Sequence, residues 1–298
     1  MKRISKLAII LAVLTACEEI TDNIDSNPSV SPVEQIPINL SVGMDTKITD
    51  TYFEQDDAVG VYVVNYVNGA PGELTVSNNH YNNVKYTYGA SWIPEVEMFW
   101  KDDTTKADIY CYYPYGTPGS VNAYPFAVKQ DQSILSNYKK SDFVWGKVSG
   151  VDPTPDIIRL NTNHVMSNMV VYVEPGDGFT AETLAAANVS VSVRNVKTNA
   201  TVNLSDGIVT ATGSAAEVTP YNESAYYRAV IVPQTVADGS ALIVVTIDDA
   251  EYALKKGFTF VCGKQHKFTV TINKTGSGIN IGVGGWETDD EDNGGSAE

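Results

Sequence analysis

Cysteine and histidine are scarce in this chain, which has three of each among its 298 residues. Cys111 and Cys262 lie far apart in strand-like runs, and neither has a second cysteine at CxxC spacing. We therefore expect two buried free thiols rather than a disulfide. His80, His164 and His266 are scattered, with no second metal ligand at helical or hairpin spacing, which favours structural roles over metal binding.

Recognisable catalytic motifs are also absent from the sequence. It contains no GxSxG nucleophile turn, no HExxH helix, no phosphate-binding P-loop and no glycine fingerprint for dinucleotides. Paired aspartates such as Asp56 and Asp57 stand in turn-like sequence, where the side chain bonds to its own backbone. Nothing nominates a catalytic, cofactor-binding or metal-binding residue, so we expect a protein that is not an enzyme and uses no cofactor.

Positive charge is in short supply, with 20 Lys and Arg against 36 Asp and Glu and a formal net charge of −16. A chain this acidic repels polyanions, which argues against nucleic acid as a partner. The C-terminal residues 287–298 are strongly acidic, but they lack the alternating ligand order of an EF-hand calcium loop. We expect an acidic, solvated tail there.

A single apolar run, Leu7–Val13, occurs at the start of the chain behind three basic residues. This arrangement is typical of a secretory signal peptide, and the run is too short for a permanent membrane span. The small residues directly before Cys17 resemble the lipobox of bacterial lipoproteins. Residues 1–16 are thus the predicted leader, with Cys17 acylated (palmitate) and holding the protein to a membrane; the alternative is a secreted protein with an incidental cysteine.

Residues 17–34 are acidic and rich in proline and serine, which predicts a tether. Beyond it, almost every apolar pattern has the period of a β-strand, and turns rich in Gly, Asn, Asp and Pro separate the strands. Only 179–188 has a helical pattern. The sequence therefore predicts an all-β fold of antiparallel sandwiches, with domains at 35–163 and 164–286.

The first predicted strand is followed by an isolated basic residue. Ile36, Ile38, Leu40 and Val42 alternate with smaller or polar residues, as in a half-buried strand. Lys47 follows, and it is the only Lys or Arg between Cys17 and Lys85. Chance scarcity in an acidic chain is one explanation of this isolation, and a single protease-sensitive site is the other.

Several segments together resemble the fimbrillin family of Bacteroidales, the subunits of the type V pilus. The resemblance runs from about residue 36 to residue 286. The motifs that carry it are FEQDDAVGVYVV (53–64), MFWKDDTTKADIYCYYPY (98–115), SDFVWGKV (141–148), IIRLNTNHVMSNMVVYV (157–173), YYRAVIVPQTV (226–236) and GFTFVCGKQHKFTVTIN (257–273). The order and spacing of these motifs make the resemblance more specific than any one of them.

This resemblance implies two tandem transthyretin-like, Greek-key sandwich domains and a structural or adhesive role in a fimbria. It also implies a lipoprotein precursor exposed on the outer membrane, which a trypsin-like protease cuts behind the first strand. In this chain the implied cut falls between Lys47 and Ile48, with lysine where arginine is commoner, and frees residues 35–47. A strand from another pilus subunit then fills the groove.

The donor of that strand is predicted to be residues 278–286, carrying Ile279, Ile281 and Val283. The alternative is that these residues form the last strand of the second domain. A host or bacterial surface ligand is a further partner that a fimbrial role implies.

Two other function classes compete with this interpretation. A surface lipoprotein that binds glycans would present exposed, coplanar rings, and the candidates are Tyr81, Tyr86, Tyr88 and Trp92. An envelope hydrolase is the third class, for which the sequence supplies no nucleophile or acid pair.

Overall fold

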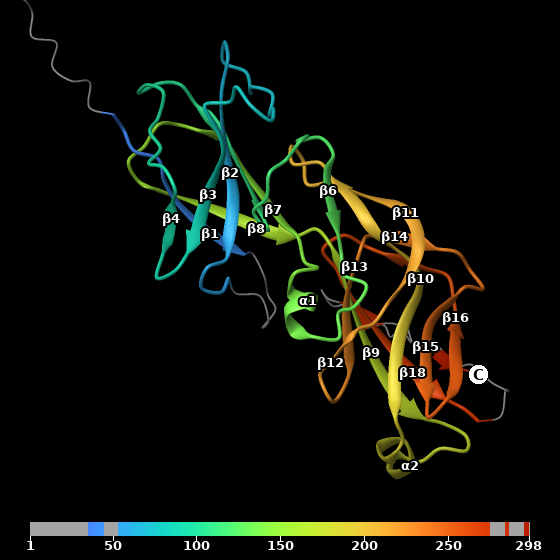
Figure 1. Cartoon of the computed structure of the whole chain (residues 1–298). Coiled ribbons are helices and arrows are strands. Elements are labelled where there is room, and N and C mark those ends of the chain that lie inside the picture. The colour runs from blue at the N-terminus through green and yellow to red at the C-terminus, as the bar shows by residue number, and fades with distance from the viewer. Residues whose placement is uncertain (1–34, 45–52, 275–283, 286–294, 298) are drawn as a thin grey trace, which may run out of the picture. The chain divides into compact units, whose positions relative to one another are not determined.

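The computed structural model describes residues 35–44, 53–274, 284–285 and 295–297 (Figure 1). Almost all of the regular secondary structure in the described part is β-strand, with two short helices. The all-β prediction is therefore confirmed. Residues Gln35–Glu298 form one compact unit. Within the described ranges, no helix is both long and apolar enough to cross a lipid bilayer.

The first sheet has seven strands in the order β1-β8-β7-β5-β2-β3-β4. Their bounds are β1 (Asn39–Met44), β2 (Ala58–Asn65), β3 (Tyr81–Tyr88), β4 (Trp92–Pro94), β5 (Ala107–Tyr113), β7 (Val144–Val151) and β8 (Ile157–His164). Each neighbouring pair is antiparallel except β1 and β8, which run parallel. β2 is central and apolar on both faces, so its middle positions are buried without alternation.

The two end strands of this sheet, β1 and β4, approach each other. The Trp92 indole N–H in β4 donates to the Val42 carbonyl in β1 at 2.8 Å. Just before β1, the Ile38 N–H donates to the Met98 carbonyl at 2.8 Å. The segment that contains β1 is therefore held along both of its edges.

The remaining strands form two larger sheets and a small ribbon. One sheet follows the order β11-β10-β15-β16 with β6 also paired to β10, and the other follows β12-β13-β9-β18-β19 with β20 also paired to β18. Their bounds are β6 (Tyr124–Ala127), β9 (Ser167–Pro175), β10 (Val189–Val202), β11 (Val209–Val218), β12 (Tyr221–Asn222), β13 (Tyr227–Ile231), β15 (Ala241–Ile247), β16 (Ala250–Lys255), β18 (Gln265–Ile272), β19 (Gly284–Gly285) and β20 (Gly295–Ala297). The ribbon pairs β14 (Gln234–Val236) with β17 (Phe258–Phe260).

The two helices are α1 (Leu135–Lys139) and α2 (Ala181–Ala186). α2 lies within the predicted helical segment, which is confirmed. Thr180 caps it by accepting a hydrogen bond from the Thr183 N–H, while the Thr183 hydroxyl accepts from the Thr180 N–H. Sequence patterning did not predict α1, which is short and has no buried residue.

Three clusters of buried side chains form the core. One lies within the seven-stranded sheet, and another lies between the two later sheets. The third combines Tyr62 and Tyr112 from the first sheet with Val202 and Val230 from the later ones. This third cluster draws on residues from both sides of position 164, where the sequence places its domain boundary; the division into two domains stays a prediction.

The cysteine prediction is only half right. Cys111 is buried in β5, whereas Cys262 is exposed. Cys262 lies in the turn between β17 and β18, beside Gly263, which has a positive φ of 69°. Turns lie at the surface because their backbone groups need water, and the apolar run FTFVC continues two residues, Val261 and Cys262, past the end of β17 at Phe260.

Candidate functional site

The first part of the candidate site is the place where β1 packs. We call it the seat of β1, and it consists of β8 and the residues of the first core cluster that contact β1. Ile38 and Val42 are only 5% and 6% exposed, and Ile36 and Leu40 pack half-buried against the same core cluster. The predicted alternation of this strand therefore matches its burial. β1 lies at the edge of its sheet in Figure 1, beside β8.

β8 is the neighbouring strand that pairs with β1 in the sheet. In the parallel register, Leu40 is opposite Ile158 and Val42 is opposite Leu160. Ile158 and Leu160 are buried, and they belong to the same cluster as the β1 side chains. Loss of β1 would therefore expose both the unpaired backbone of β8 and its apolar face.

The burial of these apolar side chains contributes a stabilising free energy that is large for one strand. Burial of an aliphatic side chain stabilises by about 1.5–3 kcal/mol. For the four alternating residues of the strand this gives an upper limit of roughly 6–12 kcal/mol, since Ile36 and Leu40 are only half buried. A typical domain is stable by only about 5–15 kcal/mol, so an emptied seat would need a replacement strand.

Most of the other residues singled out in the sequence lie outside the described ranges. These are Cys17, Lys47, Ile48, Ile279, Ile281 and Val283. Of the predicted donor segment, Gly284 and Gly285 are described as β19, which pairs antiparallel with β18 at His266 and Lys267. Residues 295–297 of the predicted acidic tail form β20, parallel to β18.

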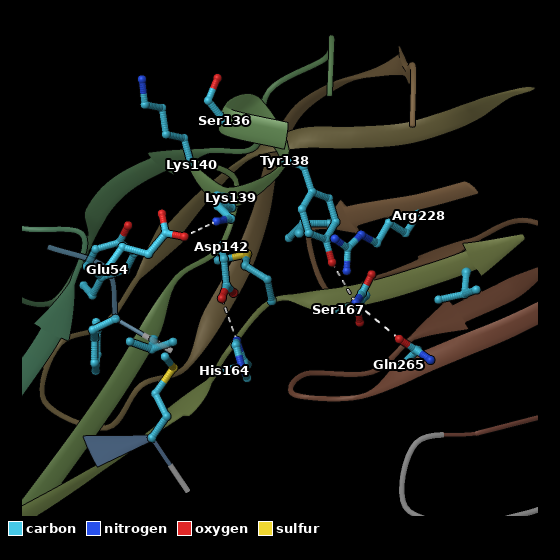
Figure 2. Close-up of a pocket in the computed structure, with 18 of the residues that line it drawn as sticks. Glu54, Ser136, Tyr138, Lys139, Lys140, Asp142, His164, Ser167, Arg228 and Gln265 are labelled. Carbon is cyan, nitrogen blue, oxygen red and sulfur yellow. Dashed lines mark hydrogen bonds and ion pairs between the residues drawn. The ribbon is translucent and has the colours of Figure 1, made fainter. Parts of the chain in front are cut away.

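A cavity of about 640 Å³ is the second part of the candidate site (Figure 2). Because β1 and β8 run parallel, their final residues, Met44 and His164, come to the same end of the sheet, and both line this cavity. Phe53 lines it as well. The chain thus enters and leaves the segment 45–52, which contains Lys47, at the wall of the cavity.

Asp142 and His164 form a close polar contact in the wall of the cavity. The His164 Nδ1 lies 2.6 Å from the Asp142 carboxylate (Figure 2). Burial lowers the pKa of His164, but the charge of Asp142 and the hydrogen bond to it outweigh burial and hold this pKa above its ordinary value near 6.5. A second ion pair, between Glu54 and Lys139, lies in the same view.

Another wall of the cavity is built around Tyr138 of α1. The Arg228 guanidinium lies 4.5 Å from the centre of the Tyr138 ring and forms an ion pair with Glu223. The Asn168 side-chain amide donates to the Tyr138 hydroxyl at 2.9 Å and to the side-chain oxygen (Oε1) of Gln265 at 3.3 Å. Side chains from α1, β9, β13 and β18 therefore meet at this wall.

Sequence reasoning missed the cavity because it searched for partners at short spacing. Asp142 and His164 are 22 positions apart in the sequence (164 − 142). They meet because Val144 pairs with His164 across β7 and β8. The signal was nevertheless present, since both residues lie in segments that carry the family resemblance, SDFVWGKV and IIRLNTNHVMSNMVVYV.

The other two histidines also have local partners. The His80 Nε2 lies 2.7 Å from the Phe99 carbonyl oxygen, and the His266 Nε2 accepts from the Val261 N–H at 3.1 Å. No group of three or more His, Cys, Asp or Glu side chains suited to a metal ion occurs in the described part of the chain.

The aromatic residues proposed as a glycan platform do not form one. Tyr86 is 2% exposed, and the rings of Tyr88 and Trp92 are tilted by 52° at 5.1 Å. Tyr81 is half-buried and its hydroxyl accepts from the Phe99 N–H at 2.9 Å. These side chains pack into or against the first core cluster, so they lack the exposed, coplanar faces that a stacking surface requires.

Comparison with known proteins gives consistent results. The fimbrillin-like family matches residues 46–286. A protein from Bacteroides uniformis, named as a candidate fimbrium subunit (Fim1C), is 25% identical over 307 aligned residues, which cover 96% of each chain.

Solved structures are similar to this one over most of their length. A candidate cell adhesion protein from Bacteroides uniformis has 22% identity and a TM-score of 0.63, covering 90% of this chain and 98% of its own. Another, from Bacteroides ovatus, has 17% identity and a TM-score of 0.67, covering 86% and 99%. At these identities the likeness establishes the fold, while the family match covers most of the sequence. The chain therefore belongs to the fimbrillin-like family.

Proposed function

We propose that this protein is a structural or adhesive subunit of a fimbria on the cell surface. Membership of the fimbrillin-like family makes it a structural protein rather than an enzyme. The observation that carries the proposal is the seat of β1, an edge strand whose apolar side chains fill the first core cluster. A subunit that exchanges such a strand with a neighbour can polymerise without further chemistry.

The proposed maturation is a single cut between Lys47 and Ile48 by a trypsin-like protease. It separates β1 from the rest of the chain and lets residues 35–47 leave the groove. An open edge beside β8 invites strand addition. Met44 and Phe53, the described residues on either side of the cut segment, both line one cavity, and this common position supports the proposal.

The proposed filling strand comes from residues 278–286 of another subunit, with Ile279, Ile281 and Val283 in the places of the β1 side chains. Pairing of Gly284 and Gly285 with the edge of β18 supports this choice, because an edge position is one from which a strand can detach. We further propose two transthyretin-like sandwich domains, at 35–163 and 164–286.

Before assembly, the proposed precursor is an outer-membrane lipoprotein. Its leader is residues 1–16, its acyl chains are on Cys17, and residues 17–34 are its tether. The protein would reach the cell surface in this form and meet the protease there. An acylated amino terminus that persists in the fibre would instead identify an anchor subunit.

A cleavage assay tests the proposal. Incubation of the protein with trypsin-like protease should yield one new amino terminus, at Ile48, and SDS-resistant ladders of polymer. The variant Lys47→Ala should stay uncut and monomeric, and Lys85→Ala, which changes the next basic residue along the chain, should behave as the wild type. Normal polymerisation of Lys47→Ala would disprove the assigned cut.

A further inference from the structure

The cavity lined by Asp142, His164 and Asn168 has the features of a small-molecule binding site, a role separate from strand exchange. Its volume of about 640 Å³ lies within the range of about 300–1,000 Å³ found for small-molecule sites. Its wall combines the rings of Tyr138, Tyr172 and Tyr226 with polar groups from four elements. Such a lining suits a ligand that is itself partly apolar and partly polar.

Two polar atoms of the wall have no hydrogen-bond partner among the described residues. They are the Nε2 of His164 and the side-chain oxygen of Asn168, and both are buried. A buried polar atom without a partner destabilises the protein, so each of the two atoms favours a ligand group that can bond with it. The Asn168 oxygen can only accept a hydrogen bond, whereas the His164 nitrogen donates when protonated and accepts when neutral. A hydroxyl group serves both, because it donates and accepts.

The charges of the wall point to a ligand without net charge. Three cations and three carboxylates line the cavity, namely Lys139, Lys140, Arg228, Glu54, Asp57 and Asp142. Glu54 is paired with Lys139, and Asp142 is paired with His164. Arg228 is paired with Glu223. A phosphate or an amine would find no excess of opposite charge here, and a neutral ligand meets no such barrier.

We propose that this cavity binds a neutral saccharide unit, whose hydroxyl groups bond to Asn168 and His164 and whose C–H face packs on the tyrosine rings. The rings of Tyr172 and Tyr226, which both line the cavity, have centroids 5.4 Å apart and an interplanar angle of 41°. This assigns carbohydrate recognition to residues 138–228 around the cavity and not to the aromatic run at 78–92. It does not depend on cleavage at Lys47.

Saturation-transfer NMR on residues 18–298 tests the assignment. The probes are free galactose, mannose, N-acetylglucosamine and lactose, with glucuronic acid as the anionic arm. At least one neutral sugar should bind saturably and more tightly than glucuronic acid. Silence of all four neutral sugars, or binding of glucuronic acid alone, would overturn the proposal.

Variants locate the binding. Asn168→Val removes the accepting oxygen and puts in its place a residue suited to a strand. This variant should weaken binding at least tenfold. Ser136→Trp adds bulk at the wall from the exposed face of α1, and it should abolish binding without removing a described side-chain hydrogen bond. Ser91→Trp makes the same change at an exposed position outside the cavity and should leave binding unchanged. Wild-type affinity in Ser136→Trp, with its thermal unfolding unaltered, would exclude this cavity.

Discussion

Gly60 in β2 has no room for a side chain. A Cβ there would lie 2.3 Å from the Asn83 side-chain oxygen and 2.3 Å from the Tyr112 ring. Neither neighbour can retreat easily, because the Tyr112 hydroxyl donates to that same oxygen at 2.8 Å and Tyr112 is 1% exposed.

Gly60→Ala should therefore lower the free energy of unfolding by about 1–3 kcal/mol, the usual cost of overpacking a core. Gly119→Ala is the matched control, since a Cβ at Gly119 meets nothing within 4 Å. It should change stability by less than about 0.5 kcal/mol. Urea unfolding of both variants checks the pair, and equal midpoints would show that β2 adjusts to the added methyl group.

The Asp142–His164 pair predicts a pH dependence of stability. The folded pKa of His164 is raised above 6.5, so its protonated form is stabilised by folding. This contribution is complete below about pH 6.5 and is lost as the pH rises through the raised folded value. In Asp142→Asn it should be missing.

The stability difference between the wild type and Asp142→Asn should accordingly shrink as the pH rises from 5.5 to 8.5. Urea titrations at several pH values measure it. A difference that stays constant over this range would mean that His164 does not gain a proton on folding.

At the scale of the element, we expect the substitution of isoleucine by alanine to have unequal effects at two positions of the segment that contains β1. Ile38 is 5% exposed, whereas Ile36 is half-buried against the same cluster. Ile38→Ala should cost about 2–5 kcal/mol of unfolding free energy, as for a fully buried isoleucine, and Ile36→Ala distinctly less. Thermal or urea unfolding of the uncut protein gives both values, and equal losses would show that the strand is not seated in the observed register.

The strands were easier to predict than their partners. Apolar alternation in β1, β10 and β18 follows directly from one buried face, so the sequence alone places these strands. Pairing depends on contacts between distant segments. The parallel match of β1 with β8 and the pairing of β6 with β10 therefore had no local signal.

The two parts of the candidate site differ in the same respect, because one could be predicted from the sequence and the other could not. The side chains of the β1 seat could be named from the sequence because a strand has a fixed period. The cavity could not, because its wall is assembled from α1, β8, β9, β13 and β18, whose lining residues lie up to 129 positions apart (265 − 136). Only the motifs around Asp142 and His164 hinted at it.

At the scale of the whole molecule, side chains and backbone tie residues before 164 to residues after it. The Trp145 indole donates to the Leu204 carbonyl at 2.8 Å. The buried Gln132 amide exchanges two hydrogen bonds with the backbone of Val230, each 2.8 Å long. These contacts surround the core cluster that both parts share.

Residues 35–298 should consequently unfold in a single cooperative transition. Three of the four tryptophans, Trp92, Trp100 and Trp145, precede residue 164, so tryptophan fluorescence reports largely on that part of the chain, and far-UV circular dichroism reports on all sheets. The two probes should give coincident urea curves. Two separated transitions would show that the first sheet and the later sheets unfold independently.

The parallel register of β1 and β8 also bears on how the seat responds to force. Its ladder runs from Asn39 opposite Ile157 to Met44 opposite Thr162, with hydrogen bonds that lie across the strand direction. A strand pulled along its own axis in such a groove loads these bonds together, in shear. A strand pulled sideways breaks them one after another, as a zipper opens. In the proposed polymer, a strand held in this groove and pulled along its own axis would meet the stronger of the two geometries.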